Sequence, residues 1–254
     1  MPRLGELTSP DFAALDPKPA LLVPVGIVEE HGPHLPLDTD TIQAVATCER
    51  VAERMGCLVA PALAYGNCSS TRNFPGSFSL GFDTLRAIAK DILLDCVRHT
   101  IPTVAFVSGH AGGAHMRALK LAAEEVVALH PTLRVFVLSD YELLGVPDGS
   151  ADPSSPRGRG FDAKAAAGVD LPRWDGHAGG METSRMLALR PDLVKPGLGK
   201  PHQVRFPDFL VEPHPERRFP TGVMGDPTKA SAALGRAANA WICDRLVEVL
   251  QQRP

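Results

Sequence analysis

The chain has 254 residues, of which 44% are hydrophobic and 22% charged, and its formal net charge is −3. This composition is typical of a globular protein, and without a basic excess it disfavours binding to nucleic acid or to a membrane surface. The sequence has no apolar run near the roughly 20 residues of a membrane-spanning helix, and no apolar signal-peptide core at its start. We therefore expect a cytoplasmic protein.

Strand-like apolar runs alternate with helical patterns through the first half of the chain. Strands are expected at 20–26, 57–66, 103–109 and 133–140, and helices at 39–56, 82–99, 113–130, 181–191 and 229–252. This alternation predicts a mostly parallel sheet with helices on both faces. Right-handed crossovers then bring the carboxyl ends of the strands to one edge.

Residues 145–173 interrupt the alternation, because they are rich in Gly, Pro and Ser and have little periodicity. A segment of this length inside a compact domain is typically a lid or an interface element. It does not separate two self-sufficient halves, so the sequence predicts one domain over residues 1–254.

The first group of functional candidates follows the strand at 20–26, in the stretch VGIVEEHGPHLPLDTD. In extended backbone, residues two apart point the same way, so Glu29 and His31 can face one site. Asp40 opens the next helix. Carboxylate and imidazole groups suit zinc, manganese or iron. The alternative for Asp40 is a helix N-cap, and for Glu29 a solvated loop charge, but their grouping after a buried strand favours metal binding.

Two further groups carry histidines in glycine-rich turns. SGHAGG (108–113) comes directly after the strand TVAFV and places His110 at the same sheet edge, unless it is an incidental histidine in a turn. DGHAGGMETS contains His177 in a loop and Glu182 in the first turn of a helix. The helix dipole alone can explain Glu182, whereas a histidine between small residues is free to approach a substrate and to titrate near neutrality.

Together with TGVMGDPTKAS at 221–231, these motifs resemble the creatininase (creatinine amidohydrolase) family over nearly the whole chain. The resemblance implies a three-layer α/β/α sandwich, two divalent metal ions per subunit, a small-molecule substrate and frequent assembly into homo-hexamers. It implies metal ligation by Glu29, His31, Asp40 and His110, with Asp40 as the bridge. Creatininase itself takes a further glutamate ligand at the position of Gly112, and Glu182 is the natural replacement here.

The resemblance also implies the reaction. His177 matches the catalytic histidine. Glu30 and His34 are expected to contact the metal ligands and orient them, without binding metal themselves. The implied activity is hydrolysis of a non-peptide C–N bond, in a cyclic amide or a formamide, by water activated between two ions. The family also includes a peptidase and cyclic-ketone hydrolases. A catalytically inactive member that binds ligand or serves in assembly is the remaining alternative.

Several positions depart from the family pattern around the expected substrate wall. Thr71 stands where many members have histidine, and Ser77 replaces a threonine. Ser77, Gly112 and Trp174 are candidate substrate contacts, although core packing explains Trp174 equally well. Arg72 can recognise a carboxylate or phosphate, but a surface ion pair is the commoner role of a single arginine.

Overall fold

The fold is built on a parallel four-stranded sheet, as the alternation predicts. The computed structural model describes residues 3–145, 160–197 and 199–252. The strands β1 (Leu21–Val25), β2 (Leu58–Val59), β3 (Thr103–Ser108) and β4 (Arg134–Ser139) lie in the order β2-β1-β3-β4. All pairs are parallel, with Val25 opposite Ser108 at one end. The carboxyl ends of β1 and β3 therefore meet.

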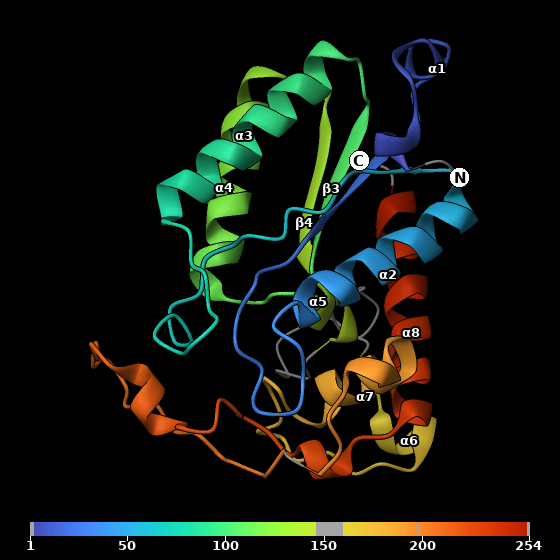
Figure 1. The fold of residues 1–254 in the computed structure, drawn as a ribbon. Coiled ribbons are helices and arrows are strands. Elements are labelled where there is room, and N and C mark those ends of the chain that lie inside the picture. Colours follow the sequence, from blue (N-terminus) through green and yellow to red (C-terminus); the bar gives the residue numbers. More distant parts are fainter. Residues whose placement is uncertain (1–2, 146–159, 198, 253–254) are drawn as a thin grey trace.

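Helices cover both faces of this sheet (Figure 1). They are α1 (Ser9–Ala13), α2 (Thr39–Met55), α3 (Phe82–Arg98), α4 (Gly113–Leu129), α5 (Asp140–Leu144), α6 (Ala163–Ala167), α7 (Gly180–Leu189) and α8 (Ala232–Gln251). Short 3-10 helices span Leu4–Glu6, Pro191–Leu193, Pro215–Arg218 and Pro227–Lys229. Leu21, Val23 and Val25 of β1 pack into the core under α3 and α4, and Leu22 into the core under α2 and α8. This alternation confirms the three-layer α/β/α sandwich.

The element bounds differ from expectation at three places. β2 ends at Val59, because Pro61 has no N–H for the ladder, and the chain continues alongside β1 through a single bridge from Val25 to Leu63. α8 begins after Ser231, whose side chain accepts the Leu234 N–H. Of the segment 145–173, residues 163–167 form α6 and residues 146–159 lie outside the described part, so the predicted lid or interface role stays a prediction.

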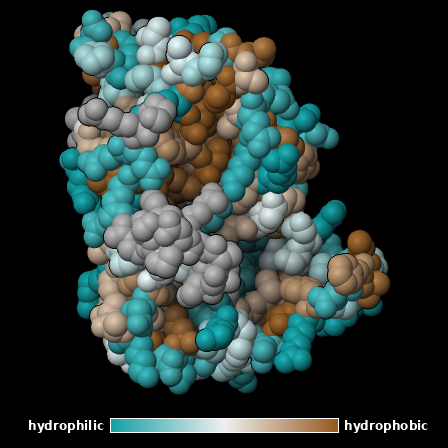
Figure 2. All heavy atoms as spheres, turned by 180° about the vertical axis from the view of Figure 1, so that it is seen from behind, coloured by the Kyte–Doolittle hydropathy of each residue, from teal (hydrophilic) through white to brown (hydrophobic). Residues whose placement is uncertain are grey.

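The edge strand β4 contributes a hydrophobic band to the surface. Its first four residues are only partly buried, and the view from behind shows this band between hydrophilic flanks (Figure 2). Among the described residues, no helix is both long and apolar enough to cross a membrane.

Glycines allow the chain to close tightly where β1, β3 and α2 meet. A Cβ on Gly109, directly after β3, would lie 2.1 Å from the Asp40 carbonyl oxygen. A Cβ on Gly26, directly after β1, would lie 2.4 Å from Thr41 Oγ1. The N–H of Gly109 also donates to Val25 O at 2.9 Å. The first turn of α2 is therefore pressed against the ends of both central strands, which places Asp40 at the sheet edge.

Candidate metal centre

Three carboxylates and two imidazoles from four segments converge at the carboxyl edge of the sheet. Glu29 and His31 come from the loop after β1, Asp40 from the first turn of α2, His110 from the turn after β3, and Glu182 from the first turn of α7. The four residues other than His110 are at most 3% exposed. The structure thus brings together all five residues that the sequence suggested as metal ligands.

Asp40 lies between the two histidines. Its Oδ1 is 3.2 Å from His31 Nε2, and its Oδ2 is 3.3 Å from His110 Nδ1. His110 Nδ1 is also 2.9 Å from Glu29 Oε1, and His31 Nε2 is 3.9 Å from Glu182 Oε2. Asp40 therefore belongs to two potential ligand sets, each with two carboxylates and one imidazole.

The donor atoms of these sets are close enough to share a cation. In Glu29–Asp40–His110 and in His31–Asp40–Glu182, one atom of each residue lies within 4.8 Å of the others. The N-cap of α2 is Asp38, and Asp40 is the second residue inside the helix. The N-cap reading of Asp40 is therefore wrong.

The electrostatics of the cluster also fit bound cations. Glu29 Oε1 and Asp40 Oδ2 are buried and accept no hydrogen bond from the described residues. Burial and the histidine charges act against each other on Asp40, and the histidines hold its pKa well below the usual range. Burial lowers the pKa of His31, but Asp40, Glu182 and Glu29 outweigh it and raise that pKa to about 10. Buried carboxylates that demand positive charge this strongly suit divalent cations.

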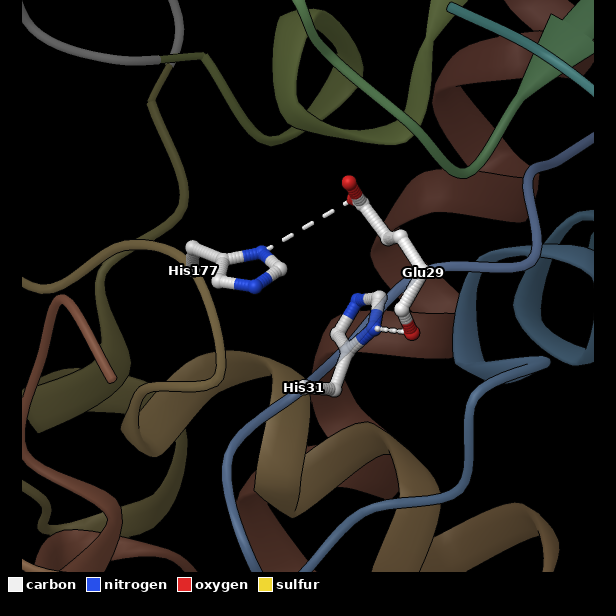
Figure 3. A group of neighbouring side chains, drawn as sticks. All are labelled: Glu29, His31 and His177. Atoms are coloured by element: carbon white, nitrogen blue, oxygen red, sulfur yellow. Dashed lines mark hydrogen bonds and ion pairs between the residues drawn. The ribbon is translucent and has the colours of Figure 1, made fainter. Parts of the chain in front are cut away.

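His177 extends from the loop before α7 and faces Glu29 across from His31 (Figure 3). Its Nε2 lies 2.8 Å from the Glu30 carbonyl oxygen and 3.1 Å from Glu30 Oε1, and its Nδ1 lies 4.0 Å from Glu29 Oε1. A carbonyl oxygen only accepts, so Nε2 carries the proton and Nδ1 is the atom that faces the cluster. Burial and His31 lower the pKa of His177, but Glu30, Glu29 and Glu182 raise it above its ordinary value.

Glu30 and His34 support this arrangement without facing a shared cation position. The Glu30 carboxylate binds His177 and accepts the Gly32 N–H at 2.9 Å. Gly222 leaves room for it: the backbone there has a φ of +73°, and a Cβ would lie 1.8 Å from Glu30 Oε2. His34 Nε2 is 2.8 Å from Thr183 Oγ1, beside Glu182.

A cavity of about 240 Å³ opens onto the cluster. It is lined by Glu29, Ser70, Thr71, Gly109, His110, Ala111, Gly112, Tyr141, Gly176, His177, Glu182 and Met224. Gly112 thus lies where a substrate contact was expected, but Ser77 and Trp174 do not line the cavity. Ser77 Oγ instead accepts the Glu30 N–H at 3.0 Å, and the chain turns so that Gly176 and His177, rather than the half-buried Trp174, reach the cavity.

Comparison with known proteins identifies the family to which this chain belongs. The model of the family described as creatinine amidohydrolase matches residues 5–250. The chain belongs to the creatininase family. It is 33% identical to a mycofactocin precursor peptide peptidase of Mycobacterium ulcerans, over 97% of this chain and 91% of the relative. It is 32% identical to the creatinine amidohydrolase of Pseudomonas putida, over 91% of this chain and 89% of the relative.

Solved creatininase structures share the fold and have been obtained with metals. A crystal structure of creatinine amidohydrolase superposes with a TM-score of 0.80 and 28% identity, covering 97% of this chain and 95% of that one. Related structures are described as a Zn-Zn type, as a Mn creatininase, and as a mutant creatininase complexed with creatine. This creatininase-family chain is accordingly a metal-dependent hydrolase.

Two side chains at this site were not recognised as functional from the sequence. Thr71, noted only as a departure from the family pattern, donates its hydroxyl to Glu29 Oε2 at 2.5 Å. Tyr141 lines the cavity, and its buried hydroxyl has no partner among the described residues. Burial raises the pKa of Tyr141 well above its ordinary value, so the hydroxyl keeps its proton. In the sequence, Tyr141 could have been noticed because it comes directly after the last predicted strand, at 133–140.

Asp175 is a third residue that the motif analysis did not single out. Its carboxylate accepts the N–H groups of Gly180 at 2.8 Å, Met181 at 2.9 Å and Asp226 at 2.8 Å. These bonds fix the start of α7 and the segment after Gly225 to the loop that carries His177. Asp175 therefore positions His177 and Glu182 relative to each other.

Proposed function

We propose that this chain hydrolyses an amide C–N bond at a centre of two divalent cations, shared by Asp40. Glu29 and His110 would hold one cation, and His31 and Glu182 the other. The observation that carries this proposal is the position of Asp40, with one carboxylate oxygen toward each histidine. Zinc, manganese and iron all accept oxygen and nitrogen ligands of this kind. Bound cations supply Lewis acidity, which polarises a carbonyl group and makes water acidic enough to attack near neutral pH.

His177 is the proton donor of the proposed reaction. Its Nε2–H is held by Glu30, so the ring cannot turn away, and Nδ1 faces the cavity. Glu30, which holds neither proposed cation, lies 3.1 Å from Nε2, and this carboxylate favours the doubly protonated ring. Nδ1–H can then give its proton to the nitrogen atom that leaves when the C–N bond breaks, and Glu30 stabilises the charged ring before the transfer.

Tyr141 and Thr71 complete the set of hydroxyl donors. The buried Tyr141 hydroxyl has an unused hydrogen-bond donor at the cavity wall, where a substrate oxygen can accept it. Thr71 instead donates to Glu29 and leaves the other carboxylate oxygen, Oε1, directed toward His110. Tyr141 is thus proposed to contact substrate, and Thr71 to orient a ligand.

Two substrate classes are candidates. The family resemblance points to a cyclic amide or a formamide, and the similarity to the Pseudomonas putida creatinine amidohydrolase supports this class. The similarity to the mycobacterial peptide peptidase supports a peptide bond as the second candidate. The cavity of about 240 Å³ is large enough for a whole small cyclic amide or formamide, whereas most of a peptide would lie outside it.

The test is turnover of a panel of cyclic amides, formamides and short peptides by the metal-loaded enzyme. The variant His177→Asn should lose at least about 100-fold in kcat, within the range typical of a general acid, while its metal content is unchanged. His214→Asn, at an exposed histidine outside the cavity, is the matched control and should retain full activity. Metal-loaded enzyme that turns over no compound of the panel would favour the inactive, ligand-binding alternative.

We also propose that the chain forms a homo-oligomer in the cytoplasm, a hexamer by family resemblance. Residues 200–219 form an arm that projects from the body in Figure 1. Its exposed apolar residues Phe209, Leu210 and Val211 support self-association. Sedimentation of the wild type and of a variant with Leu210→Ser and Val211→Ser tests this proposal. Both proteins sedimenting as monomers would refute it.

A further inference from the structure

A second, larger hollow lies beside the metal cavity. This groove has a volume of about 790 Å³ and runs between the loop from β2 to α3 and the arm at 200–219, which both extend on the same side of the body in Figure 1. It is lined by Asn67, Cys68, Ser69, Ser70, Arg72, Ser79, Leu80, Gly81, Phe82, Phe206, Glu212, Pro213 and Pro215. Ser70 lines both the groove and the metal cavity. The groove and the cavity are therefore adjacent at Ser70, and we infer that an extended molecule whose amide lies in the cavity reaches the groove past this residue.

The consecutive residues Thr71 and Arg72 line different sites, the metal cavity and the groove. Thr71 lines the metal cavity and binds Glu29, whereas Arg72 lines the groove. Residues that follow each other in extended or turn backbone direct their side chains apart, and here this places a guanidinium beside the cavity but outside it. The contact between Thr71 and Glu29 fixes the segment, so the position of Arg72 is tied to the metal cavity.

Arg72 is the unpaired charge of the groove. It is exposed and makes no ion pair or hydrogen bond with any described residue, so it does not have the surface ion pair that is the commoner role of a single arginine. The acidic residue of the groove, Glu212, is already neutralised by Arg218, whose Nη2 lies 2.5 Å from Glu212 Oε1. The groove therefore presents one positive charge without a partner.

The walls of the groove are held by hydrogen bonds. Asn67 Nδ2 donates to Leu80 O at 2.7 Å, which closes the loop on one side. Asn73 Nδ2 donates to Glu216 Oε2 at 3.0 Å, which ties this loop to the arm. Phe206, 46% exposed, provides an apolar surface on the arm side. A guanidinium, three serines and two aromatic side chains thus line a groove that shares Ser70 with the metal cavity.

We propose that the groove binds the distal part of an extended amide substrate that ends in a carboxylate, and that Arg72 binds this carboxylate. The substrate class is then an N-acylated amino acid or a short peptide with a free carboxyl end, rather than a small cyclic amide. A guanidinium matches a carboxylate with two parallel hydrogen bonds, which gives both affinity and register. This inference rests on the proposed amide hydrolysis, because the groove is assigned through its continuity with the metal cavity.

The test compares binding of matched probes to the zinc-loaded enzyme. Each pair consists of an N-acetylated di- or tripeptide with a free carboxyl end and the same peptide with a carboxamide end, and calorimetry gives both dissociation constants. The free acid should bind at least about tenfold more tightly. Arg72→Gln should remove this preference and leave carboxamide binding unchanged, whereas Arg50→Gln, at an exposed arginine on α2 outside the groove, should keep it.

Three results would overturn the inference. They are equal binding of acid and carboxamide in every pair, no measurable binding of either form, and an acid preference that persists in Arg72→Gln. The last result would show that the carboxylate binds elsewhere, for example on the cations. Since the readout is binding, the proposed hydrolysis fails separately, through the absence of turnover of any probe.

Discussion

Breaking the buried ion pair between Asp140 and Arg185 should cause a large loss of stability. Asp140 opens α5, next to Tyr141, and Arg185 lies one turn after Glu182 on α7. Arg185 Nη2 donates to Asp140 Oδ2, and Arg185 Nε donates to Asn239 Oδ1 at 2.8 Å. The side chains of Arg185 and Asp140 are 1% and 0% exposed. The pair therefore joins two helices that carry residues of the proposed active site.

Asp140→Asn removes one charge and leaves the guanidinium buried without its counter-ion. Arginine cannot lose its proton in a protein, so this variant should lose about 3–5 kcal/mol in the free energy of unfolding. For a chain of this length that corresponds to a fall in Tm on the order of 10 °C. Arg185→Met should cost less, because burial raises the pKa of Asp140 and the carboxylate can take up a proton.

The assay is urea unfolding of the wild type, both single variants and the double variant, with metal removed. The double variant should be more stable than Asp140→Asn alone, because it has no buried unpaired charge. Equal losses in the two single variants, or an additive loss in the double variant, would refute the reasoning that burial and charge pairing control this contact.

Three further variants test the surroundings of the metal centre. Tyr141→Phe removes a buried hydroxyl that has no partner among the described residues, so it should raise the free energy of unfolding by about 1 kcal/mol and lower kcat. A more stable variant with unchanged kcat would show that the hydroxyl has no role in the reaction. Thr71→Val removes the donor to Glu29 and should weaken metal binding about 10- to 100-fold in a competition titration, with Thr100→Val as the exposed control. Burial and His110 lower the pKa of His115 to about 3, so between pH 6.5 and 3 only the unfolded chain binds a proton there. The free energy of unfolding of the metal-free protein should therefore fall as pH decreases through this window, and the fall should be smaller in His115→Gln.

The sequence was sufficient to predict the elements that have strong periodicity. The strands at 20–26, 103–109 and 133–140 and the helices at 39–56, 82–99 and 113–130 agree with the structure to within one residue at nearly every end. Because parallel strands place their carboxyl ends together, the motifs after the first and third strands could be assigned to one site. The strand at 57–66 was overestimated because its apolar pattern continues past Pro61, where the ladder stops.

The side-chain contacts across the site could not be predicted in the same way. Whether Ser77 contacts a substrate or the backbone depends on how its loop folds over Glu30, and no local pattern encodes this. Trp174 looked suitable by size and by its closeness to His177, but Gly176 and His177 line the cavity instead. For Tyr141 the position after a strand is a weak signal, because it does not distinguish a tyrosine at the cavity from an ordinary core residue until α5 is placed.

Metal content measures the central claim most directly. Purified protein, saturated with zinc or manganese and desalted, should hold two ions per chain by mass spectrometry of the eluted metal. Asp40→Asn should lose both, whereas Asp38→Asn, which changes the N-cap of α2 two residues earlier, should keep both. One ion or none in the wild type, or full occupancy in Asp40→Asn, would contradict a pair of cations shared by Asp40.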